Sequence, residues 1–257
     1  MAWNDVIEAR TVRAVPSPLE SARFGRPVER LTVGAGSEST IDAVRAAVQA
    51  SDADVVVLRY PAEHVGWFAE LTGLGRTALF ADCLVYWSLR AGQGRPPAPA
   101  PGLHTAPLGA PDAVGTLVAD IFAAYGNHYL ADPLFDAAAA LEGYQEWAVR
   151  SAAEGGCLAL DDGAHVLGLA TLEDSGPRTE ILLAGVVPAA RGRGLYAHLL
   201  KAVEDHAVAR GAGEVVISTQ SHNTRVQRAW ARYGFAPVQT HVTVHLVRTA
   251  LLHPAGP

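Results

Sequence analysis

The residues best suited to chemistry lie in a short glycine- and arginine-rich segment, Arg191-Gly-Arg-Gly-Leu-Tyr196. An apolar run ending in Val186-Val187-Pro188 precedes it, and a helical pattern of Leu195, Leu199 and Val203 follows. A strand, a tight turn and a helix in this order direct several backbone N–H groups to one spot at the positive end of a helix dipole. Glycines let a ligand approach the main chain, and arginines add positive charge. A plain connecting turn is the alternative, but the agreement of strand, proline, spacing and helix favours a diphosphate site.

The same segment resembles motif A of the GNAT acyltransferase superfamily, which has the form Q/R-x-x-G-x-G/A. Arg191, Gly194 and Tyr196 occupy its three defined places, although Tyr196 replaces a small residue. The tyrosine ring would either narrow the pyrophosphate pocket or point outward. Downstream, Asn223 and the run Tyr233-Gly-Phe235 resemble the superfamily's next helix, so the resemblance covers roughly residues 103–248.

The resemblance implies that acetyl-CoA is the co-substrate and that no metal is needed. It also implies a bulge in the strand before the loop, where a backbone N–H near Val186 or Val187 would meet the thioester oxygen. The coenzyme-binding residues expected are Val186, Val187, Arg191, Gly192, Arg193, Gly194, Leu195, Tyr196, Asn223 and Trp230.

Acyl transfer to an amine also needs a base, because an alkyl ammonium is mostly charged at neutral pH. The resemblance to the histone acetyltransferase branch assigns this role to Glu180; an exposed glutamate at a strand end is the alternative. The superfamily commonly protonates the leaving thiolate with a tyrosine where this chain has Trp230, whose indole cannot release a proton. Tyr233 or His222 would then supply the proton, or the enzyme would work without an acid.

The acceptor side is expected at the junction of two helices, where Tyr125, His128 and Tyr129 lie. Aromatic and imidazole groups there could stack on a sugar or nucleobase, although helix capping and core packing explain them equally well. His241 and His245 share one face of a strand but have no third ligand, so we expect no metal site.

These residues need a scaffold that the periodicity predicts: a fold of the α/β (α+β) class, with a GNAT-type, mostly antiparallel central sheet flanked by helices and preceded by a smaller α/β domain. We expect a small N-terminal domain at 1–90, a Pro/Gly-rich linker at 91–102, the acyltransferase domain at 103–250 and a tail at 251–257. The expected strands are 30–33, 54–59, 83–89, 157–160, 165–172, 180–187, 214–218 and 241–247, and the expected helices are 41–50, 63–74, 111–125, 136–153, 195–211 and 224–233.

Composition narrows the function further. The chain has 257 residues and a formal charge of −6, which counts against nucleic acid as a partner. We find no apolar stretch long enough to span a membrane and no secretory signal, so we expect a cytoplasmic protein. Cys83 and Cys157 fit neither a disulfide framework nor a zinc site. A homodimer is compatible with the sequence, which leaves the oligomeric state open.

Together these features predict an N-acetyltransferase that acts on the primary amine of a small molecule, most simply an amino sugar, nucleotide-linked or free. A finer resemblance, to dTDP-fucosamine (dTDP-4-amino-4,6-dideoxygalactose) acetyltransferases, rests on Phe24-Gly25, Thr219-Gln220 and Asn223-Thr224. The alternatives are an acetyltransferase of an antibiotic or protein amine, and a catalytically silent module that binds acyl-CoA, which the replacement by Trp230 favours.

Overall fold

The computed structural model describes residue 3, residues 6–7 and residues 9–252. The chain divides into two compact units, each built from several segments. Unit 1 comprises residues 1–85, 126–140 and 239–257, and unit 2 comprises residues 86–125 and 141–238. Compact packing units need not share their bounds with functional domains, so the expected domain limits at 90, 102 and 250 stay a prediction.

Unit 1 contains a sheet in the strand order β1-β2-β3-β10-β4. Strands β2 and β3 are parallel, whereas β1 and β10 run antiparallel to their neighbours β2 and β3. The elements of this unit are β1 (Arg13–Pro16), α1 (Pro18–Phe24), β2 (Val28–Thr32), α2 (Ile41–Ala50), β3 (Val55–Pro61), α3 (Trp67–Leu71), the first part of β4 (Arg76–Arg90), the 3-10 turn His128–Ala131, most of β10 (Ala236–Arg248) and α8 (Thr249–Leu252).

Strand β3 is buried along its whole length because both of its faces are covered. Val56, Leu58 and Tyr60 pack with α2 and α3 on one face. Val55 and Val57 pack on the other face with Tyr129 and Phe135 from the segment 126–140. The apolar run that predicts this strand therefore reflects burial on both sides, as parallel strands require.

Two buried histidines make unit 1 sensitive to acid. His241 is fully buried, its Nε2 lies 3.2 Å from the carbonyl oxygen of Val33, and burial lowers its pKa to about 4. Burial also holds the pKa of His128 well below its ordinary value, and the neighbouring Arg59 and His245 add to the effect.

We expect the free energy of unfolding to fall as the pH drops from about 6.5 to about 4. In this window the unfolded chain binds protons on these histidines and the folded chain does not, so stability is full above the unfolded pKa and is lost below it. For His241 alone, the loss is on the order of 3 kcal/mol. Urea titrations at pH 7.5 and pH 4.5 measure it, with the exposed His165→Gln as the control. A His241→Gln variant that loses as much stability on acidification as the wild type would contradict the assignment to His241.

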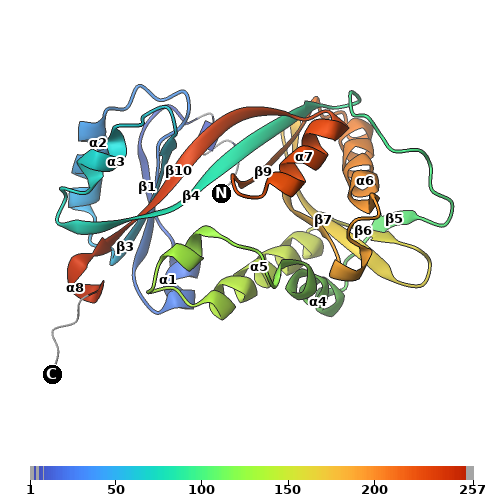
Figure 1. The fold of residues 1–257 in the computed structure, drawn as a ribbon, viewed down its shortest axis with the longest axis horizontal. Helices are drawn as coiled ribbons and strands as arrows, with labels where there is room; N and C mark the ends of the chain where they lie inside the picture. Colours follow the sequence, from blue (N-terminus) through green and yellow to red (C-terminus); the bar gives the residue numbers. More distant parts are fainter. Residues whose placement is uncertain (1–2, 4–5, 8, 253–257) are drawn as a thin grey trace. The chain divides into compact units, whose positions relative to one another are not determined.

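Unit 2 contains a sheet in the order β4-β9-β8-β7-β6-β5, in which β8 and β9 are parallel and β5 to β8 are antiparallel to one another. In Figure 1, α4 and α5 lie on one side of this sheet, whereas α6 and α7 lie together on the other side. Its elements are the end of β4, β5 (His104–Pro107), α4 (Pro111–Phe122), most of α5 (Ala137–Ala153), β6 (Cys157–Asp161), β7 (Val166–Ser175), β8 (Arg178–Val186), the 3-10 turn Pro188–Ala190, α6 (Leu195–Ala209), β9 (Glu214–Gln220) and α7 (Thr224–Tyr233).

The structure confirms the predicted fold class: a mixed, mostly antiparallel sheet flanked by helices. Helices α2 and α7 match their predicted bounds, but the helix expected at 63–74 is reduced to the five residues of α3. Strands β1 and β5 and helix α1 were not predicted. None of the described helices has the length and apolar character needed to cross a membrane.

Candidate functional site

Strands β8 and β9 diverge and thereby open the sheet of unit 2. They pair in parallel only from Arg178 with Glu214 to Ile181 with Ile217, although β8 continues to Val186 and β9 to Gln220. On its other edge, β8 pairs with β7 through a register shift that leaves Leu182 as an extra residue. Such a bulge increases the local twist and ends pairing, so the two strand ends leave an unpaired gap between them.

The loop that follows β8 has the geometry of an anion site. Gly192 and Gly194 have φ angles of +82° and +78°, which favour glycine, and an added Cβ would meet open space at both positions. In the part of the chain that the structure describes, the amides of residues 192–196 have no hydrogen-bond acceptor. Helix α6 begins at Leu195 and runs for 15 residues, so its positive end adds to the field at these amides.

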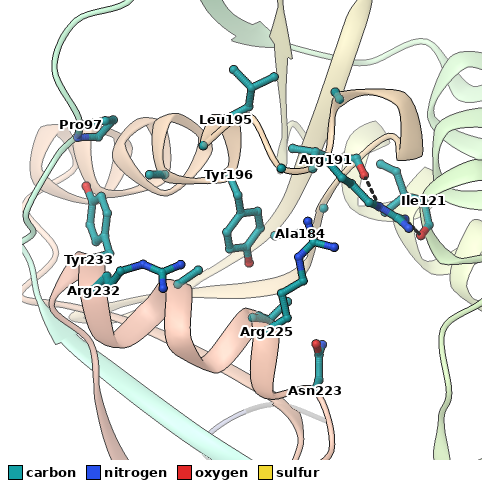
Figure 2. Close-up of a pocket in the computed structure, with 18 of the residues that line it drawn as sticks. Pro97, Ile121, Ala184, Arg191, Leu195, Tyr196, Asn223, Arg225, Arg232 and Tyr233 are labelled. Atoms are coloured by element: carbon teal, nitrogen blue, oxygen red, sulfur yellow. Dashed lines mark hydrogen bonds between the residues drawn. The ribbon is translucent and has the colours of Figure 1, made fainter.

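A cavity of about 630 Å³ joins this loop to the gap between the strands (Figure 2). Four arginines line it and, among the described lining residues, no aspartate or glutamate does. The lining residues are Arg95 and Pro97; Ile121, Phe122, Ala124 and Tyr125; Ala184, Gly185 and Val186; Ala190, Arg191, Gly192, Gly194, Leu195, Tyr196 and Ala197; and Asn223, Arg225, Val226, Ala229, Arg232 and Tyr233.

The four arginines are not equivalent. Arg191 donates from Nη2 to the carbonyl of Ile121 at 2.8 Å and from Nε to the carbonyl of Val186 at 3.3 Å, so it fastens the end of α4 to the end of β8. Arg95, Arg225 and Arg232 make no ion pair within the described chain. In an acidic protein, unpaired arginines around one cavity indicate a polyanionic ligand.

The segment that provides Arg95 is held to α6 and α7. The amide of Gly94 donates to Glu204 at 2.8 Å, and the amide of Arg95 donates to the carbonyl of Tyr233 at 2.6 Å. The phenol of Tyr233 donates to Glu204 at 2.6 Å. Burial, together with this hydrogen bond, raises the pKa of Tyr233. Although Tyr233 lines the cavity, its proton is therefore directed to Glu204, which argues against the acid role expected for it.

Most of the residues expected to bind the coenzyme line the cavity. These are Val186, Arg191, Gly192, Gly194, Leu195, Tyr196 and Asn223.

Three of the residues expected to bind the coenzyme do not line the cavity. Arg193 lies outside the lining. The amide of Val187 donates to the carbonyl of Leu167 at 2.9 Å and so belongs to the sheet. The indole of Trp230 is buried and donates to the hydroxyl of Tyr196 at 3.0 Å.

The expected catalytic and acceptor residues are divided between the two units. Tyr125 lines the cavity and bonds to Thr219 and Gln220. His128 and Tyr129 belong to the interior of unit 1, where they are 4% and 9% exposed. Glu180 lies in the fully paired part of β8 and does not line the cavity.

The neighbours of His128 and Tyr129 explain this correction. His128 Nδ1 lies 2.9 Å from His245 Nε2, and His245 Nδ1 lies 3.0 Å from Asp132. Tyr129 donates to Glu20, which pairs with Arg30. These polar groups are satisfied within the core, so the core-packing alternative holds for both residues. His245 also has its hydrogen-bond partners in this cluster.

Three of the lining arginines, Arg95, Arg225 and Arg232, were not predicted from the sequence. Arg225 and Arg232 are seven residues apart on α7 and therefore share one helix face, a spacing that could have been noticed. Arg95 could not have been predicted in this way, because it lies in a proline-rich segment without periodicity.

One family comparison matches the part of the chain that carries this site. Residues 118–235 match the sequence model of the acetyltransferase (GNAT) family. The matched residues include the loop, α6 and all of α7.

The sequence matches to individual proteins cover only part of each chain. A mycothiol acetyltransferase of Nocardia farcinica is 36% identical over 70 residues, which cover 27% of this chain and 23% of the relative. One of Corynebacterium glutamicum is 33% identical over 86 residues, covering 33% and 30%. The chain thus spans less than a third of the length of either relative.

Solved structures share the fold at low identity. A GCN5-related N-acetyltransferase from Sphaerobacter thermophilus is 16% identical with a TM-score of 0.61, covering 92% of this chain and 76% of that one. The glucosamine N-acetyltransferase region of a fungal multi-domain GH3 β-N-acetylglucosaminidase is 11% identical with a TM-score of 0.57, covering 91% and 31%. At these identities the likeness concerns the fold alone.

Proposed function

We propose that the protein transfers an acetyl group from acetyl-CoA to the primary amine of a small molecule, most simply an amino sugar. One observation carries the proposal: free main-chain amides at residues 192–196 and four arginines surround one cavity that contains no carboxylate among its described lining residues. Coenzyme A carries a diphosphate and a further phosphate, and such a ligand matches both the amides and the charge.

The gap between β8 and β9 provides a place for the pantetheine arm and the thioester. In an antiparallel ladder, the amides of successive residues face opposite edges of the strand. Because the amide of Val187 bonds to β7, the amide of Val186 faces the edge where β9 has diverged. It is therefore the donor suited to the thioester oxygen, a contact that strengthens as charge develops on that oxygen.

An amino sugar is the acceptor class that best fits the supporting likenesses. The fungal glucosamine N-acetyltransferase region, which shares this fold, gives this class support, as does the resemblance of a few residues to dTDP-fucosamine acetyltransferases. The mycothiol acetyltransferases support acetyl transfer without naming this acceptor class. Tyr125 and Phe122 offer aromatic surface on the cavity wall, on which a sugar ring could stack.

A panel of amines tests the function. The protein is incubated with acetyl-CoA and a thiol reagent together with amino sugars, nucleotide-linked amino sugars, aminoglycosides or lysine peptides. Release of free thiol that depends on an amino sugar is the expected result. Release of free thiol that depends instead on an antibiotic or a peptide amine would show that the acceptor is not an amino sugar. Tight CoA binding without any amine-dependent release would identify a silent binding module instead.

Although Glu180 does not itself line the cavity, we propose it as the base, with the amine proton reaching it through a water molecule. Changing Glu180 to Gln is then expected to remove the acid limb of the pH–rate profile and to lower kcat by about 100-fold, while the affinity for CoA is unchanged. Glu173→Gln is the matched control, because Glu173 lies directly opposite Glu180 on β7. An unaltered profile in the Glu180 variant would place the base elsewhere.

A further inference from the structure

Three tyrosines line the cavity, and the hydrogen bonds of their hydroxyl groups differ. Tyr233 donates its proton to Glu204, and the hydroxyl of Tyr125 donates to Gln220. Tyr196 instead accepts a hydrogen bond from the indole of Trp230 at 3.0 Å. A hydroxyl has one donor and two acceptor positions, so this contact leaves its proton available. Within the described chain, no acceptor for that proton is found.

The position of Tyr196 determines where its hydroxyl proton points. The residue is the second of α6, directly after the phosphate loop, and Figure 2 shows its ring pointing from α6 toward α7. Trp230 does not itself line the cavity, so its indole acts there only through the hydroxyl of Tyr196. Tyr125, which bonds to the end of β9, is close enough to Tyr196 to interact with it electrostatically. The Tyr196 hydroxyl therefore lies between α7 and the strand ends.

We propose that Tyr196 is a catalytic residue whose hydroxyl donates a proton to the sulfur of the departing coenzyme A. This inference rests on the proposed function. The amine nitrogen forms a bond with the acetyl carbon, and the C–S bond then breaks with its electron pair moving to sulfur. Sulfur takes the Tyr196 proton and becomes the thiol. Glu180 takes the first proton of the ammonium before attack, and the nitrogen loses a second proton as it becomes an amide; this second proton restores the phenol. Trp230 is a positioning residue, because its N–H holds the Tyr196 oxygen and turns the O–H away from α7.

The environment of Tyr196 agrees with a donor role. Burial raises the pKa of its phenol, while the hydrogen bond from Trp230 acts in the opposite direction. The group is therefore protonated throughout the neutral range. A thiolate that forms in the same cavity is also poorly solvated, which raises its affinity for a proton.

Binding of coenzyme A and of desulfo-CoA, which lacks the sulfur, tests the contact without an acceptor. Calorimetry is expected to show that the wild type binds CoA about fivefold more tightly than desulfo-CoA, the effect of one ordinary hydrogen bond. In Tyr196→Phe the ratio is expected to fall to about one, whereas Tyr233→Phe is expected to retain it. With the active amine, Tyr196→Phe is expected to lower kcat by about 10- to 100-fold with little change in the KM for acetyl-CoA.

The outcomes separate the two proposals. If neither compound binds the wild type, the proposed function fails. If both bind equally well to the wild type and to Tyr196→Phe, the function stands and the role of Tyr196 is overturned. A loss of kcat in Tyr233→Phe but not in Tyr196→Phe would give the role to Tyr233. Trp230→Phe is expected to lower kcat less than Tyr196→Phe, because it removes only the positioning contact; an equal or larger loss would contradict this order.

Discussion

Replacing Gly194 with glutamate is expected to abolish coenzyme A binding, with at least a 100-fold rise in Kd (on the order of 3 kcal/mol). The Cβ of a residue at this position points into open space beside the free amides, so the new carboxylate would stand where the diphosphate binds. Like charges at short range in a partly enclosed cavity repel strongly. The measurement is calorimetric titration with CoA, with the melting temperature recorded for each variant.

Gly194→Ala separates charge from backbone strain. Because the φ angle is +78°, any L-residue is strained here by about 1 kcal/mol, and alanine carries this strain without the charge. We expect alanine to weaken binding by less than tenfold. If the glutamate variant bound CoA as the wild type does, the ligand would not use this loop, and the assignment of the cavity would be wrong.

The double variant Arg225→Gln with Arg232→Gln is expected to raise the Kd for CoA by about 30-fold. Both side chains extend from the same face of α7 into the cavity, and neither has an acidic partner in the described chain. Their loss removes two charges that face the phosphates. The dependence of affinity on salt should also become weaker, because fewer charge contacts remain to be screened.

The matched control is Arg228→Gln, which lies on the same helix but does not line the cavity. It has the same helical context and changes the charge by one unit without touching the site. We expect its Kd and salt dependence to stay near those of the wild type. An effect of Arg228→Gln as large as that of the double variant would show that net charge, and not the cavity, governs binding.

The sequence predicted the loop well because its information is local. Strand β8, the glycines and α6 adjoin in the chain, so their order alone determines a turn with exposed amides. The same holds for α7, whose bounds match the predicted range 224–233. Where a function depends on neighbouring residues in the chain, periodicity and turn chemistry suffice.

The acceptor residues were less predictable because their partners are distant in the chain. The segment with His128 and Tyr129 packs against Glu20, Arg30 and His245, which lie about 100 residues or more away. Nothing in the local pattern distinguishes a polar residue that faces a ligand from one satisfied in a core. The hydrogen bond between Tyr196 and Trp230 was likewise not predictable, because it joins residues on two helices that are 34 positions apart in the chain.

The proline-rich stretch at 91–102 was expected to act as a spacer or a surface loop. Its amides at Gly94 and Arg95 are instead secured to Glu204 and Tyr233, and Arg95 and Pro97 form part of the cavity wall. A Cβ on Gly94 would collide with the Glu204 carboxylate. Lengthening or shortening this stretch would therefore reshape the binding chamber itself, so relatives of this protein with altered coenzyme or acyl preference can be sought among those whose chain differs in length here.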